Sequence, residues 1–332
     1  MDWNIVETSA PGRAGIVGNP SDMYGGSMLS AATRERARCR VEPADALTLT
    51  IGGESAAPRT AADLVPIGDR VDIARAALRA LGIDPATERF RLEASTEVPI
   101  SAGLAGSTAL LAAIVGALNA ARGIQQHHYT LVETVRAIEC GEMGVLCGFQ
   151  DATMAVFGAL RFMDLRGREE LRQGPDEPYV VAEQLTVPEF PFLCAHTGIR
   201  RHSGQVHKSM RERWEEGEPA VVEGYLRIQR LAALGKRALL DGDWTRLAAL
   251  MTENHAIQRD LGGSGDSNER LIAAALEGGA LAAKLAGAGG GGTIIALTLE
   301  PERTAKALEA AGADRLLTPD PSAPGLTVAS SL

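Results

Sequence analysis

The spacing of apolar and polar positions changes several times along the 332-residue chain, and each change predicts a new element. Short stretches in which apolar and polar residues partly alternate between turn residues are typical of strands, because successive side chains of a strand point to opposite faces. A fully apolar stretch of the same length predicts a buried strand. On this basis strands are expected at 3–8, 39–43, 47–52, 89–96, 158–165, 178–187, 189–198, 281–288 and 292–300.

Apolar residues at helical spacing predict helices, beginning with 70–82, where Gly82 suits the end of a helix. The stretch 106–123 is apolar almost all round, which predicts a central, buried helix. The order of elements predicts an α+β protein of two lobes, with an N-terminal domain over 1–185 and a C-terminal domain over 186–332. Further helices are expected at 129–144, 205–217, 220–241, 243–260, 267–278 and 301–313.

Composition narrows the class of protein. Hydrophobic residues make up 45% of the chain, enough for a substantial core, and the net charge of −9 argues against a nucleic-acid-binding protein, which needs a basic face. No apolar run approaches the roughly 20 residues that span a bilayer, and the N-terminus does not resemble a signal peptide. We therefore expect a cytoplasmic protein with neither membrane nor nucleic acid as partner. Four cysteines without regular spacing are expected to be free thiols: Cys39, Cys140, Cys147 and Cys194.

Three segments combine glycine with polar residues: 10–26, 98–113 and 287–292. The first is expected to form two turns around a short apolar strand. The second leads through glycines into the buried helix, whose first turn has free N–H groups and the positive end of the helix dipole, both of which attract anions. The alternative for its Ser107 and Thr108 is helix capping. Five of the six residues in the third are glycine, which predicts either a flexible turn or a backbone nest for an anion.

In this order the three segments resemble the motifs of the GHMP kinases, the superfamily of galactokinase, homoserine kinase and mevalonate kinase. "PGRAGIVGNPSDMYGG" is similar to the family's substrate motif, "PISAGLAGSTA" to its phosphate loop, and "KLAGAGGGGTIIAL" to its C-terminal glycine motif. The resemblance implies a two-lobed fold, with an N-terminal lobe like ribosomal protein S5 domain 2 and a ferredoxin-like C-terminal lobe. It also implies ATP-dependent phosphoryl transfer, with Mg²⁺, to a small molecule.

The resemblance implies roles for particular residues. A magnesium ligand is expected at Thr108, or at Ser107 beside it, because a hydroxyl there matches the family's serine. Its carboxylate partner is expected at Glu139 or Glu142, which are three residues apart and share a helix face; the alternative for either is an ordinary solvated position. Contacts to the nucleotide are implied for Pro99, Gly103, Leu104, Ala105, Gly106, Ser107, Thr108, Gly287, Gly289 and Gly290.

Asp151 aligns with the residue proposed as the catalytic base in this family, and Arg13 aligns with the basic residue of the first motif. A carboxylate near the attacking hydroxyl can accept its proton, and a guanidinium beside that carboxylate lowers its pKa. The alternative for Asp151 is a cap of the following helix. Substrate contacts are implied for Asn19, Asp22, Tyr24, Gln150, Arg200 and Arg201. For Tyr24 the contact would be stacking on a sugar ring, and the alternative is a position in the core.

Within the superfamily, "GNPSD", "SGQVHKSMRERW" and "GFQDATMAVFGALRFMDL" resemble segments of glucuronokinases. That resemblance implies conversion of a uronic acid to its 1-phosphate, with Arg200 and Arg201 holding the carboxylate. The alternatives are a heptose-phosphate kinase, another sugar kinase of this superfamily, a mevalonate-type kinase, and a sensor that binds sugar or ATP without catalysis. The protein is expected to act as a monomer or homodimer.

Overall fold

The computed structural model describes residues 4–168, 177–199, 210–289 and 292–331. Their strands are β1 (Ile5–Val17), β2 (Ser27–Pro43), β3 (Thr48–Ile51), β4 (Glu54–Ala56), β5 (Phe90–Thr96), β6 (Leu160–Asp164), β7 (Val181–Leu185), β8 (Phe192–His196), β9 (Ala282–Leu285), β10 (Thr293–Leu297), β11 (Arg315–Leu317), β12 (Pro319–Asp320) and β13 (Thr327–Ser331). The larger sheet has the order β13-β1-β2-β5-β3-β4, with β6 and β12 paired to β2 and β7 paired to β6. The smaller sheet has the order β11-β8-β10-β9.

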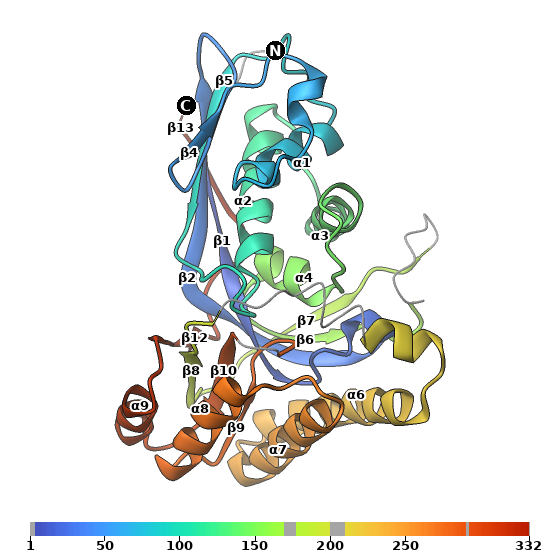
Figure 1. Ribbon diagram of the computed structural model, residues 1–332, viewed down its shortest axis with the longest axis vertical. Coiled ribbons are helices and arrows are strands. Elements are labelled where there is room, and N and C mark those ends of the chain that lie inside the picture. Colours follow the sequence, from blue (N-terminus) through green and yellow to red (C-terminus); the bar gives the residue numbers. More distant parts are fainter. Residues whose placement is uncertain (1–3, 169–176, 200–209, 290–291, 332) are drawn as a thin grey trace.

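The described helices are α1 (Asp72–Ala80), α2 (Gly106–Ala121), α3 (His128–Ala137), α4 (Gln150–Phe157), α6 (Pro219–Leu240), α7 (Trp244–Asp260), α8 (Asp266–Glu277) and α9 (Pro301–Ala310). Short turns are η1 (Asp22–Tyr24), η2 (Ala61–Leu64) and η3 (Ile138–Glu142), the last of them π-helical. Helices α1 to α4 lie beside the long strands β1 and β2, α6 packs against β2 and α7, and α7 to α9 lie around the smaller sheet (Figure 1). Among the described residues no helix is both long and apolar enough to span a bilayer.

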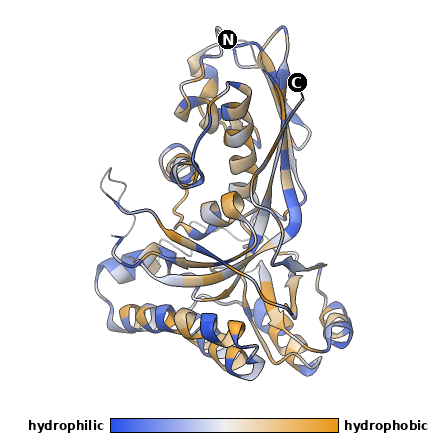
Figure 2. Cartoon of the chain, turned by 180° about the vertical axis from the view of Figure 1, so that it is seen from behind, coloured by the Kyte–Doolittle hydropathy of each residue, from blue (hydrophilic) through white to orange (hydrophobic). Residues whose placement is uncertain are grey.

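Helix α2 is the centre of the N-terminal half. All of its residues except Ser107 and Ala120 are buried, as its nearly uniform apolar sequence predicts, and it packs against β1 and β2. The helices around the smaller sheet instead carry both polar and apolar residues, and the apolar side of each helix faces the core (Figure 2). The buried α2 fixes the position of its own first turn, where the second glycine-rich segment enters.

The helices and strands predicted within the described residues are found, with shifted ends. The helix expected over 129–144 is observed as α3, which continues into η3. Of the segment expected as a helix over 205–217, the described part is helical over 210–215. The mixed α+β architecture with two sheets is the predicted one. The chain passes from the larger sheet to the smaller one between β7 and β8, near the domain boundary expected at 185. This boundary stays a prediction, because β12 and β13 return to the larger sheet.

Residues 10–17 were expected to include a turn, and this prediction is wrong. They continue β1, which pairs with β2 through register shifts between Pro11 and Arg13 and between Gly15 and Val17. The glycines serve close packing here: a Cβ on Gly12 would lie 2.7 Å from the carbonyl oxygen of Leu104. Glycine in a strand marks such a close backbone approach as readily as it marks a turn.

Gly287 and Gly292, at the two ends of the glycine segment, pack against the loop that precedes α2. A Cβ on Gly287 would lie 2.7 Å from the carbonyl oxygen of Gly103, and one on Gly292 would lie 2.5 Å from that of Ala102. Gly289 has φ of +95° and lies against Gly263, with 1.7 Å between a hypothetical Cβ and the Gly263 oxygen. Each of these positions therefore needs glycine, so a flexible turn is not the reason for the cluster.

We expect Gly287→Ala to lower the free energy of unfolding by about 1–3 kcal/mol, because the added methyl overlaps backbone atoms that cannot rotate away. Denaturation by urea measures the change. Gly141→Ala is the matched control, because nothing lies within 4 Å of a Cβ there. Equal stability of the two variants would show that residues 287 and 103 do not approach as closely as described.

Candidate active site

Arg13 joins all three glycine-rich segments. Its side chain extends from β1 and is only 4% exposed. Nε donates to Asp151 Oδ1 at 2.8 Å, and Nη2 lies 2.6 Å from the same oxygen. Nη1 donates to the carbonyl oxygens of Gly103 and Ala286. One guanidinium therefore connects β1, the loop before α2, the start of the glycine segment and the first turn of α4.

The loop 98–105 holds its backbone in an unusual conformation. Ser101, Gly103 and Ala105 all have positive φ, at 58°, 77° and 60°. For Ser101 and Ala105, which carry a Cβ, this region costs on the order of 1 kcal/mol or more each. Ala105 occupies the N-cap position of α2, and no side chain caps the helix. Capping by Ser107 or Thr108 is therefore not observed, and the first N–H groups of α2 have no side-chain acceptor in the described structure.

Of the remaining residues predicted to contact nucleotide, Leu104 and Gly106 have only backbone groups near the loop. The Leu104 side chain is buried in the core, while its carbonyl accepts a hydrogen bond from Arg13 N at 2.9 Å. A Cβ on Gly106 would lie 2.9 Å from the carbonyl oxygens of Val98 and Pro99, so the loop folds tightly back on itself. Such a narrow glycine-lined backbone at a helix start suits the phosphates of a nucleotide.

Thr108 and Glu139 meet inside the protein. Thr108 Oγ1 donates to Glu139 Oε1 at 2.7 Å, and the two residues are each only 3% exposed. Glu139 lies on η3; a π-helical turn of this kind often accompanies a functional site. Burial raises the pKa of Glu139 to about 8, and the charge of Asp151 adds to this, whereas the Thr108 hydrogen bond opposes it. A hydroxyl and a carboxylate oxygen form a hard-ligand pair that suits Mg²⁺.

Glu142 and Ser107, the alternatives for the metal, have different surroundings. Glu142 Oε2 accepts from Arg79 Nε at 2.7 Å and lies 2.6 Å from its Nη2, so this carboxylate already has a cation. Ser107 is partly exposed at the start of α2, and its hydroxyl has no hydrogen-bond partner in the described part of the chain. Of the predicted candidates, Thr108 and Glu139 are therefore the hydroxyl and carboxylate that the structure brings together.

Asp151 and Asp22 lie near each other beside Arg13. Asp151 is in the first turn of α4, whose N-cap is Phe149, so Asp151 is not the cap. Asp22 Oδ2 accepts from the backbone N–H of Gln150 at 3.0 Å. Burial raises the pKa of Asp22; the Gln150 hydrogen bond opposes the rise and the charge of Asp151 adds to it. Among the described residues Asp22 has no ion-pair partner, so its carboxylate remains able to accept hydrogen bonds from hydroxyl groups.

The Gln150 side chain is directed into the protein rather than towards a ligand. Its Nε2 donates to Ser30 Oγ at 2.6 Å, and the residue is 2% exposed. The backbone of Gln150, by contrast, holds Asp22. The predicted substrate contact by this side chain is therefore not favoured, and Gln150 positions Asp22 instead.

Asn19 was predicted to contact substrate, and the structure places it elsewhere. Its side chain is fully buried; Nδ2 donates to the carbonyl of Gly287 at 3.2 Å and Oδ1 accepts from Lys284 Nζ at 2.8 Å. Asn254 Nδ2 donates to its backbone oxygen at 3.2 Å. Both ends of the amide are thus used within the protein, so Asn19 connects the first segment to the glycine segment.

Tyr24 was predicted either to stack on a sugar ring or to belong to the core, and the core alternative holds. Its ring packs 4.4 Å from Tyr225 and 4.6 Å from Trp214, and the residue is 6% exposed. These rings belong to a small cluster that connects η1 to α6. Tyr24 therefore stabilises the turn that carries Asp22.

Lys284 is a site residue that the sequence predictions missed. It lies on β9, is fully buried, and donates to Asn19 Oδ1 and to the Leu285 carbonyl at 2.6 Å. No carboxylate lies within ion-pair distance of Nζ among the described residues. Burial lowers the pKa of Lys284 well below its usual range, and the charge of Arg13 adds to the effect. A lysine within an otherwise apolar strand, just before the glycines, was the available signal.

Phe149 is held between two arginines, a feature with no clear sequence signal. The guanidinium carbons of Arg136 and Arg168 lie 4.0 and 3.9 Å from the centre of its ring. Arg168 also forms an ion pair with Glu133 at 2.7 Å. Because Phe149 occupies the N-cap position of α4, this arrangement fixes the helix turn that carries Asp151.

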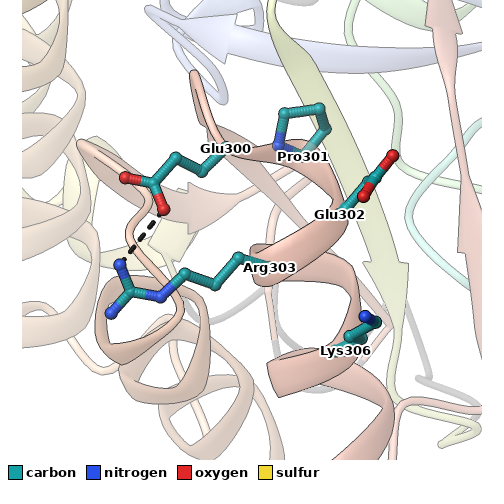
Figure 3. A pocket seen from close by; sticks show the side chains of 5 residues that line it. All are labelled: Glu300, Pro301, Glu302, Arg303 and Lys306. Carbon is teal, nitrogen blue, oxygen red and sulfur yellow. Dashed lines mark hydrogen bonds and ion pairs between the residues drawn. The ribbon is translucent and has the colours of Figure 1, made fainter.

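Three predicted site residues lie outside the described part of the chain: Arg200, Arg201 and Gly290. A separate surface hollow of about 520 Å³ lies at the start of α9, lined by Glu300, Pro301, Glu302, Arg303 and Lys306 (Figure 3). Arg303 Nη1 pairs with Glu300 Oε2 at 3.1 Å there. The hollow contains none of the residues predicted for the site.

Comparison with known proteins matches both halves of the chain. The family model "GHMP kinases N terminal domain" matches residues 71–159, and "GHMP kinases C terminal" matches residues 236–315. Probable glucuronokinase 2 of Arabidopsis thaliana is 27% identical over 318 residues, which cover 87% of this chain and 84% of the relative. Mevalonate kinase of Pyrococcus horikoshii is also 27% identical, over 335 residues that cover 94% of this chain and 95% of the relative.

The fold also matches that of a solved mevalonate kinase. The crystal structure of L. major mevalonate kinase in complex with R-mevalonate superposes with a TM-score of 0.74 at 21% identity, covering 97% of each chain. A glycine-lined loop at a helix start, a buried hydroxyl–carboxylate pair and an arginine-paired aspartate are compatible with phosphoryl transfer, which depends mainly on positioning and charge stabilisation. The protein is therefore an ATP-dependent small-molecule kinase. It belongs to the GHMP kinases, whose members generally use ATP and Mg²⁺.

The high pKa of Glu139 predicts a pH dependence of stability in the absence of Mg²⁺ and nucleotide. The folded chain keeps the proton up to about pH 8, whereas an unfolded glutamate releases it near pH 4.3. The stabilising contribution is therefore complete at acid pH and is lost as pH rises towards 8. We expect the free energy of unfolding to fall less between pH 5 and 8 in Glu139→Gln than in the unmodified protein.

Urea denaturation at several pH values measures these slopes. Glu142→Gln, whose carboxylate is partly exposed and paired with Arg79, should keep the slope of the unmodified protein. Parallel slopes for Glu139→Gln and the unmodified protein would show that Glu139 is ionised in the folded state.

Proposed function

We propose that this kinase transfers the γ-phosphoryl group of ATP to a hydroxyl of a uronic acid, giving the sugar-acid 1-phosphate. The observation that carries the proposal is the pair of carboxylates beside Arg13. Asp151 is paired with the guanidinium, and Asp22 is held by the Gln150 N–H with no ion-pair partner among the residues that the structure describes. One carboxylate can serve the reacting hydroxyl while the other accepts hydrogen bonds from further hydroxyls of the ring.

The reaction asks the protein mainly for positioning and for compensation of charge. ATP with Mg²⁺ supplies the transferable phosphoryl group and part of the positive charge around it. We propose that the N–H groups of loop 98–105 and of the first turn of α2 bind the phosphates, and that Thr108 and Glu139 hold the metal. The donor set fits, because the loop is narrow at Gly103 and Gly106 and the oxygens of the pair are 2.7 Å apart.

Asp151 is proposed as the base that accepts the proton of the attacking hydroxyl. At 24% side-chain exposure, against 4% for Arg13, it is the more accessible member of their ion pair. Arg13 keeps the carboxylate ionised and oriented, and its remaining donors hold the carbonyls of Gly103 and Ala286. The base is thereby kept at a fixed position relative to the phosphate loop, as near-attack geometry requires.

The choice of a uronic acid also rests on the chemistry of the relatives. Glucuronate and mevalonate, the substrates named in those relatives, are both hydroxy acids. A polyhydroxylated ring makes fuller use of Asp22 than mevalonate, which has two hydroxyls. The carboxylate is proposed to bind Arg200 or Arg201, since a guanidinium binds a carboxylate in bidentate fashion. Phosphorylation of mevalonate is the second candidate, because a mevalonate kinase is as similar to this chain as a glucuronokinase.

We expect Asp151→Asn to lower kcat by at least about 100-fold, because the amide cannot accept the proton. The affinity for ATP should stay near that of the unmodified enzyme, since the amide oxygen still accepts from Arg13. Steady-state kinetics and nucleotide titration measure the two effects. Nearly normal turnover would assign Asp151 a structural role and remove the proposed base.

A screen by coupled ADP release tests the substrate. We expect kcat/KM for glucuronate to exceed that for galactose and glucose by at least about tenfold, the contribution of one charge-assisted contact. Asp22→Asn should raise KM for the uronic acid while keeping the Gln150 contact. If mevalonate is the best substrate, the sugar-acid proposal fails and the kinase assignment stands.

A further inference from the structure

Cys140 and Cys147 lie side by side although seven residues separate them. Their sulfur atoms are 3.5 Å apart, and both residues are partly exposed. The other two cysteines, Cys39 and Cys194, are buried. The sequence predicts four free thiols; the structure makes two of them an accessible pair.

This pair adjoins the residues proposed to hold Mg²⁺ and the substrate. Cys140 directly follows Glu139 on η3, and Cys147 Sγ donates to Glu139 Oε2 at 3.6 Å. Cys147 also precedes Gly148, where a Cβ would lie only 2.1 Å from Asp22 Oδ2. The chain between the two thiols therefore connects the candidate metal carboxylate to the segment that leads to Asp151.

We propose that Cys140 and Cys147 form a reversible oxidation site at which a small disulfide such as glutathione disulfide converts the pair to an intramolecular disulfide and weakens Mg²⁺-dependent nucleotide binding. One cysteine thiolate attacks a sulfur of the reagent and releases one glutathione thiolate. The other cysteine attacks the mixed disulfide and releases the second. The two cysteine protons pass to the two released thiolates, so the protein pair is oxidised and the reagent is reduced.

The geometry explains why such a bond affects the site. The sulfurs must close from 3.5 Å to about 2.05 Å. The Cys147 S–H donor to Glu139 is lost, and the Cys147 backbone is drawn towards η3. Gly148 has no free space against Asp22, so the shift reaches both carboxylates. Loss of a contact that orients a metal ligand typically lowers metal affinity 10- to 100-fold.

The test uses the full chain, treated with glutathione disulfide and then freed of reagent. Peptide mass spectrometry is expected to find a Cys140–Cys147 crosslink in the treated protein. The Mg²⁺ concentration for half-maximal ATP binding should rise at least about tenfold and return to its original value after dithiothreitol. ATP binding requires no knowledge of the sugar, so failure of the proposed substrate does not affect this readout.

Cys140→Ala is the control, because the hydrogen bonds of the Cys140 side chain among the described residues are to the sulfur and carbonyl of Cys147. Its ATP binding before treatment should match the unmodified protein, and treatment should leave the Mg²⁺ requirement unchanged. Two results would overturn the proposal: glutathione adducts in the unmodified protein without the crosslink, or the crosslink without a change in Mg²⁺ requirement.

Discussion

The guanidinium of Arg13 is the interaction on which the rest of the site depends. It is buried, yet its charge is matched by Asp151 and its other donors meet the carbonyls of Gly103 and Ala286. A buried ion pair is stable only when such additional hydrogen bonds compensate the loss of water. Residues far apart in the sequence are therefore held in one arrangement by a planar group that lysine could not replace.

That arrangement explains why glycine is needed at so many positions despite its cost in conformational entropy. Backbone carbonyls can converge on one side chain only if the strands and loops that carry them approach without intervening Cβ atoms. Gly12 lies against Leu104, and Gly287 lies against Gly103, in both cases at distances that exclude alanine. The conformational entropy lost at these glycines, and the strain at Ser101 and Ala105, are consequences of the same close approach.

Periodicity predicted the helices well because burial sets the spacing of apolar residues, and the three motifs led to the residues that surround Arg13. Neither periodicity nor the motifs predict which side chains of distant segments contact one another. Asn19 and Tyr24 look like ligands in sequence, since both stand among turn residues and glycines, but packing from α6, α7 and β9 covers them. Glu139 and Glu142 share a helix face in sequence, and contacts distant along the chain distinguish them: Thr108 with Glu139 and Arg79 with Glu142.

The ionisable groups around Arg13 show how ligand binding is linked to protonation. Burial alone favours neutral forms, which is why the pKa of Glu139 and Asp22 is raised and that of Lys284 is lowered. A divalent cation beside Glu139 reverses this preference, since it favours the carboxylate, and phosphate anions near Lys284 favour the ammonium. In the absence of ligands the site therefore keeps the Glu139 carboxyl in its neutral form, and a divalent cation would favour the carboxylate. Binding of Mg²⁺ beside Glu139 is then linked to release of a proton from that residue at pH values below its raised pKa, so the metal affinity rises with pH in this range.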